Sequence, residues 1–221
     1  MQAAPDRSRI LFIGNSYTSR NQLPRLIAEL AASGQLPRRV EVAAIVAGGA
    51  SLRRQWNAGL AQKALAGTPW THVVLQEQST LPIKNAARYH DNVRQFIPEI
   101  AAHRARTVLY QTWARQQAPQ MQDDINRAVE EIAVEVGGLV VPVGRAWQVA
   151  IDRGFAADLY ERDGSHPTPA GSYLAACVFV VSLFGVTPVG FTVADSLGIE
   201  RTFASTLQEI AWNCRPQPPE R

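Results

Sequence analysis

Short apolar runs alternate along the chain with longer stretches in which apolar residues recur at helical spacing. The short runs are bounded by glycine or polar residues, which is typical of strands buried on both faces. Five such runs predict strands at 9–13, 39–46, 71–75, 107–111 and 139–143. In the first amphipathic stretch, 22–33, the apolar positions follow a helical period and Gly34 ends it. Further helices are predicted at 52–66, 86–102, 121–136, 145–153, 169–184 and 194–212.

Strands that alternate with helices indicate βαβ units, and therefore an α/β fold with a parallel sheet and helices on both faces. A length of 221 residues suits one such domain. We find no internal repeat and no linker long enough to separate two domains. The sequence predicts a single domain over 9–214, a flexible leader at 1–8 and a flexible tail at 215–221, which is rich in proline and charge.

Composition and charge exclude several classes of partner. Apolar residues make up 46% of the chain, charged residues 19%, and the net charge is only +3. Because the arginines are scattered rather than clustered, we expect no nucleic-acid partner. The longest apolar run, 173–184, is shorter than the roughly 18 residues of a membrane span, so none is predicted. Oligomeric state stays open.

Neither a disulfide framework nor a metal site is indicated. The two cysteines, Cys177 and Cys214, are expected to be free thiols. His72, His90 and His103 lack the spacing of metal ligands, so we assign no metal and no cofactor.

The cellular compartment stays open. Residues 2–6 resemble the polar start of a mature exported protein, without a signal peptide in this sequence. Both an exported protein, periplasmic or extracellular, and a cytoplasmic one fit these residues.

Residues 163–167, Asp-Gly-Ser-His-Pro, carry the clearest chemistry. They hold Asp163 and His166 three positions apart in a turn, and a carboxylate in that place orients and charges an imidazole. Part of the segment has a plain structural reading, since Thr168 is a good helix N-cap and Pro169 a good first helical residue. That reading does not account for the acid and the imidazole, and the segment lacks a nucleophile.

The nucleophile can come from the far end of the chain. Ligands of parallel α/β sheets bind at the carboxyl ends of the strands, and polar or glycine-rich turns follow four of the predicted strands. Each turn taken alone is an ordinary cap or tight turn. Together with the Asp-His segment they predict one site, in which His166 activates Ser16. The turns contain Ser16, Gly48-Gly49, Gln76 to Ser79, and Trp113 to Arg115.

Residues 12–16, Phe-Ile-Gly-Asn-Ser, and 163–167 together resemble the SGNH/GDSL-type hydrolases, and the resemblance covers nearly the whole chain. The chain is similar to a branch with Gly-Asn-Ser-Tyr-Thr and Val-Val-Leu-Gln-Glu-Gln-Ser segments. The resemblance implies a flavodoxin-like, three-layer α/β/α sandwich of about five parallel strands in the order 2-1-3-4-5. It also implies that Ser16 is the nucleophile, His166 the general base and Asp163 the residue that orients it.

An oxyanion hole is implied as well, formed by the Ser16 N–H, the Gly49 N–H and a side-chain amide. Two positions depart from the family pattern. Asn15 stands where the family usually has aspartate, and Gln78 stands where it has the amide-donating asparagine. Gln76 has the same strand parity as Gln78 and stays an alternative donor.

The expected function is hydrolysis of carboxylic esters through an acyl-enzyme. Because no long lid segment is visible, we expect short acyl groups such as acetyl on a bulky alcohol, for example a saccharide. The partner is thus a small-molecule or saccharide ester. Tyr17, Trp113 and Arg115 are expected to line the substrate pocket, although Trp113 fits the core equally well.

Two other functions stay open. The strand, glycine turn and helix at the N-terminus also fit a flavodoxin-like phosphate loop that binds a flavin or nucleotide. A non-catalytic carbohydrate-binding module is the other alternative, which the intact Ser16, Asp163 and His166 disfavour.

Overall fold

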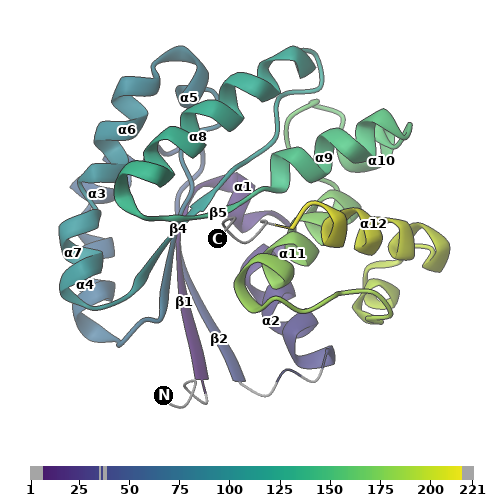
Figure 1. Cartoon of the computed structure of the whole chain (residues 1–221), viewed down its shortest axis with the longest axis horizontal. Helices are drawn as coiled ribbons and strands as arrows, with labels where there is room; N and C mark the ends of the chain where they lie inside the picture. The colour runs from purple at the N-terminus through teal and green to yellow at the C-terminus, as the bar shows by residue number, and fades with distance from the viewer. Residues whose placement is uncertain (1–6, 35, 37–38, 216–221) are drawn as a thin grey trace, which may run out of the picture.

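The computed structural model describes residues 7–34, 36 and 39–215, and its centre is a five-stranded parallel sheet (Figure 1). The strand order is β2-β1-β3-β4-β5, and every pair is parallel, which confirms the predicted fold class. The strands are β1 (Arg7–Gly14), β2 (Arg39–Val46), β3 (His72–Leu75), β4 (Arg106–Tyr110) and β5 (Leu139–Val141).

Helices cover both faces of the sheet. In Figure 1 the earlier group lies to the left of the strands and the later group, with α2, to the right. The first group contains α3 (Leu52–Asn57), α4 (Leu60–Gly67), α5 (Leu81–Lys84), α6 (Ala86–Arg94), α7 (Ile97–Ala102) and α8 (Gln122–Val136). The second contains α2 (Leu23–Ser33), α9 (Val143–Asp152), α10 (Ala156–Leu159), α11 (Pro169–Phe184) and α12 (Arg201–Asn213).

Each face has its own apolar core because successive side chains of a strand point to opposite sides. In β1, Ile10 and Phe12 belong to the core beneath α2, α9, α11 and α12. Leu11 and Ile13 belong to the core beneath α3 to α8. Helix α11 is apolar on all sides since it packs between the sheet and neighbouring helices, with residues 171–181 buried.

Three predicted helices are interrupted. The stretch 52–66 is two helices, α3 and α4, separated at Gly59, whose φ of 72° is left-handed. The stretch 86–102 divides into α6 and α7, and Pro98 lies in the first turn of the second. The last helix starts at Arg201 rather than at 194, after a 3₁₀ turn, η3 (Val193–Leu197), and left-handed Gly198. In each case a glycine or proline ends one helix inside a continuous apolar pattern.

The other boundaries shift by a few residues. Strand β1 begins at Arg7, so the predicted leader 1–8 is wrong for its last two residues, and 1–6 lie outside the described residues. Strand β5 is shorter than predicted because Val143 already starts α9. Helices α5 and α10 were not predicted, each being a single four-residue turn. Of the predicted tail 215–221, residues 216–221 also lie outside the described part.

The register brings the carboxyl ends of the strands level with one another. Gly14 pairs with Val46, and Leu75 pairs with both Ile13 and Leu109. The turns that follow β1, β2 and β3 therefore leave the sheet side by side. Gly14 is required there for close approach, since a Cβ at this residue would lie 2.6 Å from the Gln76 Oε1 atom.

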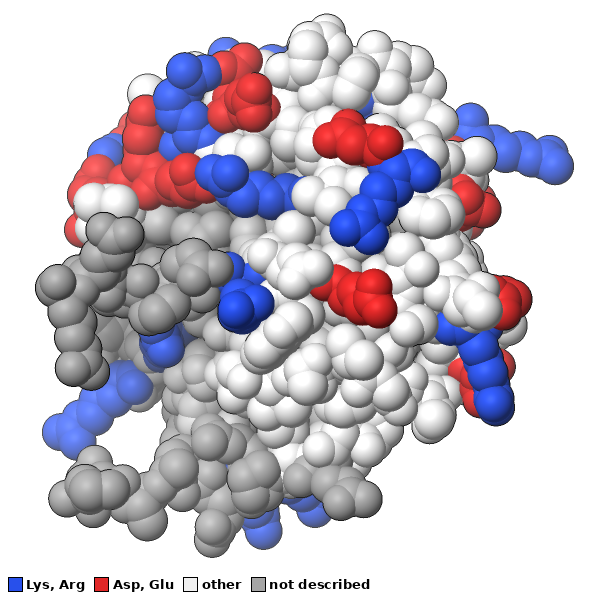
Figure 2. Space-filling view, turned by 45° about the vertical axis from the view of Figure 1, so that its right-hand side comes forward, with Lys and Arg blue, Asp and Glu red and all other residues white. Residues whose placement is uncertain are grey.

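The surface carries mixed charge on the face drawn in Figure 2, where acidic and basic side chains are interspersed. Within 7–34, 36 and 39–215, no helix combines the length and the apolar character needed to cross a membrane. Cys177 is buried and Cys214 half-buried, and both are free thiols as predicted.

Candidate active site

The Asp-His turn lies between α10 and α11 and holds its two side chains together by local geometry. The Asp163 Oδ1 atom accepts hydrogen bonds from the backbone N–H groups of Ser165 and His166, each at 2.9 Å. Its second oxygen, Oδ2, lies 2.5 Å from His166 Nδ1. Asp163 therefore shapes the turn as well as contacting the imidazole. As predicted, Thr168 caps α11 through a hydrogen bond from the Gly171 N–H.

Ser16 reaches this turn from the other end of the chain. It is the first residue of a short helix, α1 (Ser16–Ser19), which Asn15 caps by accepting a hydrogen bond from the Tyr17 N–H. The Ser16 Oγ atom lies 2.9 Å from His166 Nε2. The sequence separation of 150 residues is closed by the fold, because both segments lie at the carboxyl edge of the sheet.

The charge on Asp163 determines which nitrogen of the imidazole carries the hydrogen. The hydrogen bond with the His166 side chain, together with the backbone N–H donors, lowers the pKa of Asp163 to about 2. The carboxylate is thus ionised at neutral pH and can only accept. His166 Nδ1 must then donate to it. In the tautomer with a single hydrogen on Nδ1, the Nε2 lone pair faces the Ser16 hydroxyl.

A pocket of about 160 Å³ opens in front of Ser16. Three hydrogen-bond donors at this pocket have no acceptor among the described residues: the Ser16 N–H, the Gly49 N–H and the Gln78 Nε2 amide. Gly49 has a φ of 63°, which turns the backbone after β2. The pocket is lined by Asn15, Ser16, Tyr17, Gly49, Gln78, Ser79, Arg115, Ser165 and His166.

The two glutamines after β3 occupy different environments. Gln76 is fully buried, and its Oε1 accepts from the Asn15 N–H and the Thr18 hydroxyl, while its Nε2 donates to the Glu77 carbonyl. Gln78 is only half-buried, and Thr80 binds its Oε1 through both N–H and hydroxyl. The anchored oxygen leaves the Gln78 Nε2 at the pocket, whereas both amide atoms of Gln76 are already used.

Asn15 connects the loops around the pocket, a role that the sequence did not reveal. Its side-chain Nδ2 donates to the carbonyl oxygens of Ala50, at 3.0 Å, and Glu77, at 3.4 Å. Aspartate, the usual family residue here, cannot donate these bonds. The Asn15 amide thus joins the turns after β1, β2 and β3.

Glu77 is a second such residue and is 5% exposed. Its Oε1 accepts from the Leu52 and Gln78 N–H groups, and its Oε2 accepts from the Asn92 side chain. Burial raises the pKa of the Glu77 carboxyl, and these hydrogen bonds oppose the rise. The carboxyl holds the turns that bear Gly49 and Gln78 against α6.

Asn21 holds the Asp-His turn against the segment that carries Ser16. Its side-chain Nδ2 donates to the Pro167 carbonyl at 3.0 Å and to the Ser172 hydroxyl at 2.9 Å. Asn21 and Gln22 have left-handed φ angles of 50° and 52°, which cost a non-glycine residue roughly 1–2 kcal/mol each. Such strain persists where surrounding contacts outweigh it, as the two Asn21 bonds do.

The three predicted substrate-binding residues have different positions. Trp113 is 1% exposed and belongs to the core, where it stacks between Tyr17 and Trp147, so the prediction that it lines the pocket is wrong. Tyr17 lines the pocket and is hydrogen-bonded to Ser165 Oγ at 2.8 Å. Burial raises the pKa of Tyr17, which keeps its hydroxyl protonated. Arg115 is exposed at the pocket.

The described residues offer no candidate for a metal centre. Over the described ranges, no group of three or more His, Cys, Asp or Glu side chains is arranged to hold a metal ion.

The lowered pKa of Asp163 predicts how its contribution to stability depends on pH. The ionised carboxylate stabilises the fold above its ordinary pKa of 3.8, and this contribution is lost as pH falls toward about 2. We therefore expect the wild type to exceed Asp163→Asn in urea midpoint at pH 6, by a small margin because the side chain is half-exposed. The margin should shrink steadily below about pH 4. A margin independent of pH would contradict the assignment of the stabilising charge to Asp163.

Asn15→Asp should destabilise the protein although the family usually has aspartate here. The change removes two buried donors and sets a carboxylate against the Ala50 and Glu77 carbonyl oxygens. We expect urea denaturation to show a loss of about 1–3 kcal/mol in the free energy of unfolding. The matched control is Asn85→Asp, because Asn85 caps α6 only as an acceptor of the Arg88 N–H. Equal stability of the two variants would refute the role of the Asn15 amide.

Comparisons with known proteins place this geometry in context. The chain is similar to a candidate SGNH hydrolase from Slackia heliotrinireducens, with 34% identity over 78% of this chain and 97% of that one, and a TM-score of 0.65. A DUF4886 family protein from Bacteroides uniformis has 22% identity, 94% coverage of each chain and a TM-score of 0.69. An acetyl xylan esterase from Geobacillus stearothermophilus has 18% identity over 83% of this chain and 95% of that one, with a TM-score of 0.65. These last two show a shared fold.

No protein-family model matches the chain, and no curated protein matches it. The Slackia relative, matched over nearly all of its length at more than 30% identity, decides the family. The chain belongs to the SGNH hydrolases and is a hydrolase that acts on ester bonds.

Proposed function

We propose that this protein cleaves short-acyl carboxylic esters through a triad of Ser16, His166 and Asp163. The observation that carries the proposal is the continuous hydrogen-bond chain from Ser16 Oγ to His166 Nε2, at 2.9 Å, and from His166 Nδ1 to Asp163 Oδ2, at 2.5 Å. A nucleophile, a base and a group that orients the base stand in sequence, which is the arrangement that acyl transfer requires.

In the acylation step, Ser16 Oγ attacks the ester carbonyl carbon and its proton moves to His166 Nε2. Asp163 stabilises the imidazolium that forms. The negative charge on the carbonyl oxygen would be held by the Ser16 N–H, the Gly49 N–H and the Gln78 amide, which have no acceptor among the described residues. The bond to the alkoxy oxygen then breaks, and the His166 proton passes to the departing alcohol.

In the deacylation step, a water molecule attacks the carbonyl carbon of the Ser16 ester and gives its proton to His166 Nε2. The bond between this carbon and Ser16 Oγ breaks, and the proton returns from His166 to Ser16. A carboxylic acid is released and the enzyme is restored. The same base and the same oxyanion donors serve both steps.

The size and lining of the pocket support a short acyl group such as acetyl. A volume of about 160 Å³ leaves little space beyond the reacting groups, and the lining is mostly polar. A long acyl chain would need an apolar channel, which these residues do not form. The Geobacillus relative is named an acetyl xylan esterase, and this suggests acetylated saccharides as the alcohol side to test.

The alternative of a phosphate loop finds little support in the first turn. Such a loop needs several unpartnered backbone N–H groups, but the N–H groups of Asn15, Tyr17, Thr18 and Ser19 are all bonded within the turn or to Gln76. Of the N–H groups of residues 15–19, only that of Ser16 has no acceptor among the described residues. One donor suits an oxyanion, whereas a phosphate group would need more.

Ser16→Ala is the direct test. Turnover of p-nitrophenyl acetate should fall by at least about a thousandfold, because the proposed acyl-enzyme forms on the Ser16 hydroxyl. The melting temperature should stay close to that of the wild type, and Ser205→Ala on α12 serves as the matched control. In the wild type, esters of longer acids should be cleaved less efficiently than the acetate. Retained turnover, or a fluorophosphonate adduct on a residue other than Ser16, would overturn the proposal.

Gln78→Ala should impair catalysis, whereas Gln76→Ala should impair stability. Loss of an oxyanion donor at Gln78 should lower kcat by about 10²–10³ with little change in KM and in melting temperature. Gln76→Ala removes buried bonds to Asn15 and Thr18, so it should lower the melting temperature. Thermal denaturation and steady-state kinetics on the same preparations separate the two outcomes. A kcat effect confined to the Gln76 variant would exclude Gln78 as the donor.

A further inference from the structure

The pocket at Ser16 contains a positive charge that the described part of the chain does not neutralise. Arg115 is the only lysine or arginine of the lining, and the lining includes no aspartate or glutamate. Among the described residues, no carboxylate lies within ion-pair distance of Arg115. The nearby Asp163 carboxylate is bonded to His166 Nδ1, on the side of the ring opposite the atom that contacts Ser16.

The backbone around Arg115 is firmly held beside the Asp-His turn. The Gln116 N–H donates to the Gly164 carbonyl at 2.9 Å, and the Tyr160 hydroxyl donates to the Ala114 carbonyl at 2.7 Å. The Trp113 indole N–H donates to the Ser165 carbonyl at 3.0 Å. The segment before α8 is thereby tied to the turn that carries His166, so the backbone of Arg115 stays beside this turn.

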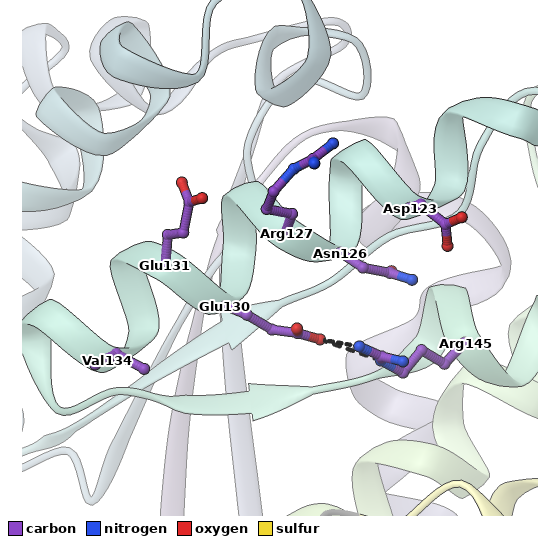
Figure 3. A pocket seen from close by; sticks show the side chains of 7 residues that line it. All are labelled: Asp123, Asn126, Arg127, Glu130, Glu131, Val134 and Arg145. Carbon is purple, nitrogen blue, oxygen red and sulfur yellow. Dashed lines mark hydrogen bonds and ion pairs between the residues drawn. The ribbon is translucent and has the colours of Figure 1, made fainter.

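The two cations that line another pocket, Arg127 and Arg145, are paired with carboxylates. A larger pocket of about 390 Å³ lies between α8 and α9, and Figure 3 shows Arg145 directed at Glu130 across it. The Arg145 Nη2 and Glu130 Oε1 atoms are 2.5 Å apart. Arg127, which lines the same pocket, pairs with Asp124. The protein pairs both of these pocket cations with carboxylates, whereas Arg115 lines the pocket at Ser16 without such a partner among the described residues.

The position of Arg115 indicates which part of an ester it would meet. Gly49 and Gln78 follow β2 and β3, and would face the carbonyl oxygen. Arg115 follows β4 and is tied to the turn of His166, the residue that protonates the departing alcohol. An ester bound with its carbonyl oxygen at Gly49 and Gln78 would have its alcohol side next to Arg115.

We propose that Arg115 selects esters whose alcohol carries a negative charge, such as a carboxylate. An acetylated acidic saccharide is the substrate class that combines this feature with a short acyl group. A guanidinium group binds a carboxylate through two parallel hydrogen bonds, which an ammonium or a neutral amide cannot reproduce. The inference rests on the proposed ester hydrolysis at Ser16, and it adds the charge of the alcohol.

The experiment compares kcat/KM for 4-acetoxybenzoate, which is anionic, and 4-acetoxybenzamide, its neutral counterpart of similar shape. The ratio of the two kcat/KM values is measured for the wild type, Arg115→Gln and Arg115→Lys. The two esters differ in chemical reactivity, but this difference is the same for every variant and cancels when the ratios are compared. Arg153→Gln is the matched control. It removes the same positive charge as Arg115→Gln, but Arg153 is exposed and does not line the pocket. Melting curves verify that each variant is folded.

We expect the ratio of anionic to neutral ester to fall by about five- to tenfold in Arg115→Gln. It should fall less in Arg115→Lys and stay unchanged in Arg153→Gln. Raising the salt concentration to about 0.5 M should reduce the ratio of the wild type toward that of Arg115→Gln. Suppose the ratio is equal in the wild type and Arg115→Gln, and cleavage of the neutral ester still depends on Ser16. This result would refute charge selection by Arg115 and leave the proposed ester hydrolysis intact. Absence of Ser16-dependent cleavage of the neutral ester would instead overturn the proposed function and this inference with it.

Discussion

Polar groups at the carboxyl edge of the sheet lie out of contact with water and must find hydrogen-bond partners within the protein. Asn15, Gln76 and Glu77 supply these partners, and together they join the turns after the first three strands. Each of them is at most 5% exposed. Because this network fixes the turns after β1, β2 and β3, the Ser16 and Gly49 N–H groups, which have no acceptor among the described residues, are held at the pocket.

The Asp-His turn is attached to the same edge from the opposite side. Asn21 bonds the Pro167 carbonyl, and Trp113 bonds the Ser165 carbonyl from within the aromatic stack. The stack belongs to the core beneath α11, so the position of His166 depends on the packing of that core. An arrangement held from both sides needs little reorganisation when charge develops in a reaction, which is the condition under which fixed dipoles contribute most to catalysis.

The strands and the regular helices could be predicted from the sequence, whereas the helix interruptions and the position of Trp113 could not. Strand positions and order followed from short apolar runs and from the resemblance to a family. The fifteen-residue helix α8 and the sixteen-residue helix α11 were found because their pattern is regular. The interruptions of the predicted helices 52–66 and 86–102 were missed because Gly59 and Pro98 lie inside apolar patterns that continue on both sides. The position of Trp113 was undecided for a similar reason, since an indole at a strand end fits either a pocket or a core.

The sequence by itself determined the α/β class and the residue types that follow each strand, because these depend on periodicity and on order along the chain. It also offered two glutamines with the same parity after β3 and could not choose between them. The tertiary structure decided that question. Gln76 points into a buried network with both amide atoms bonded, while Thr80 anchors only the oxygen of Gln78. Whether a polar atom is available for chemistry depends on which partners lie within about 3 Å of it, and those partners come from segments far apart in the chain.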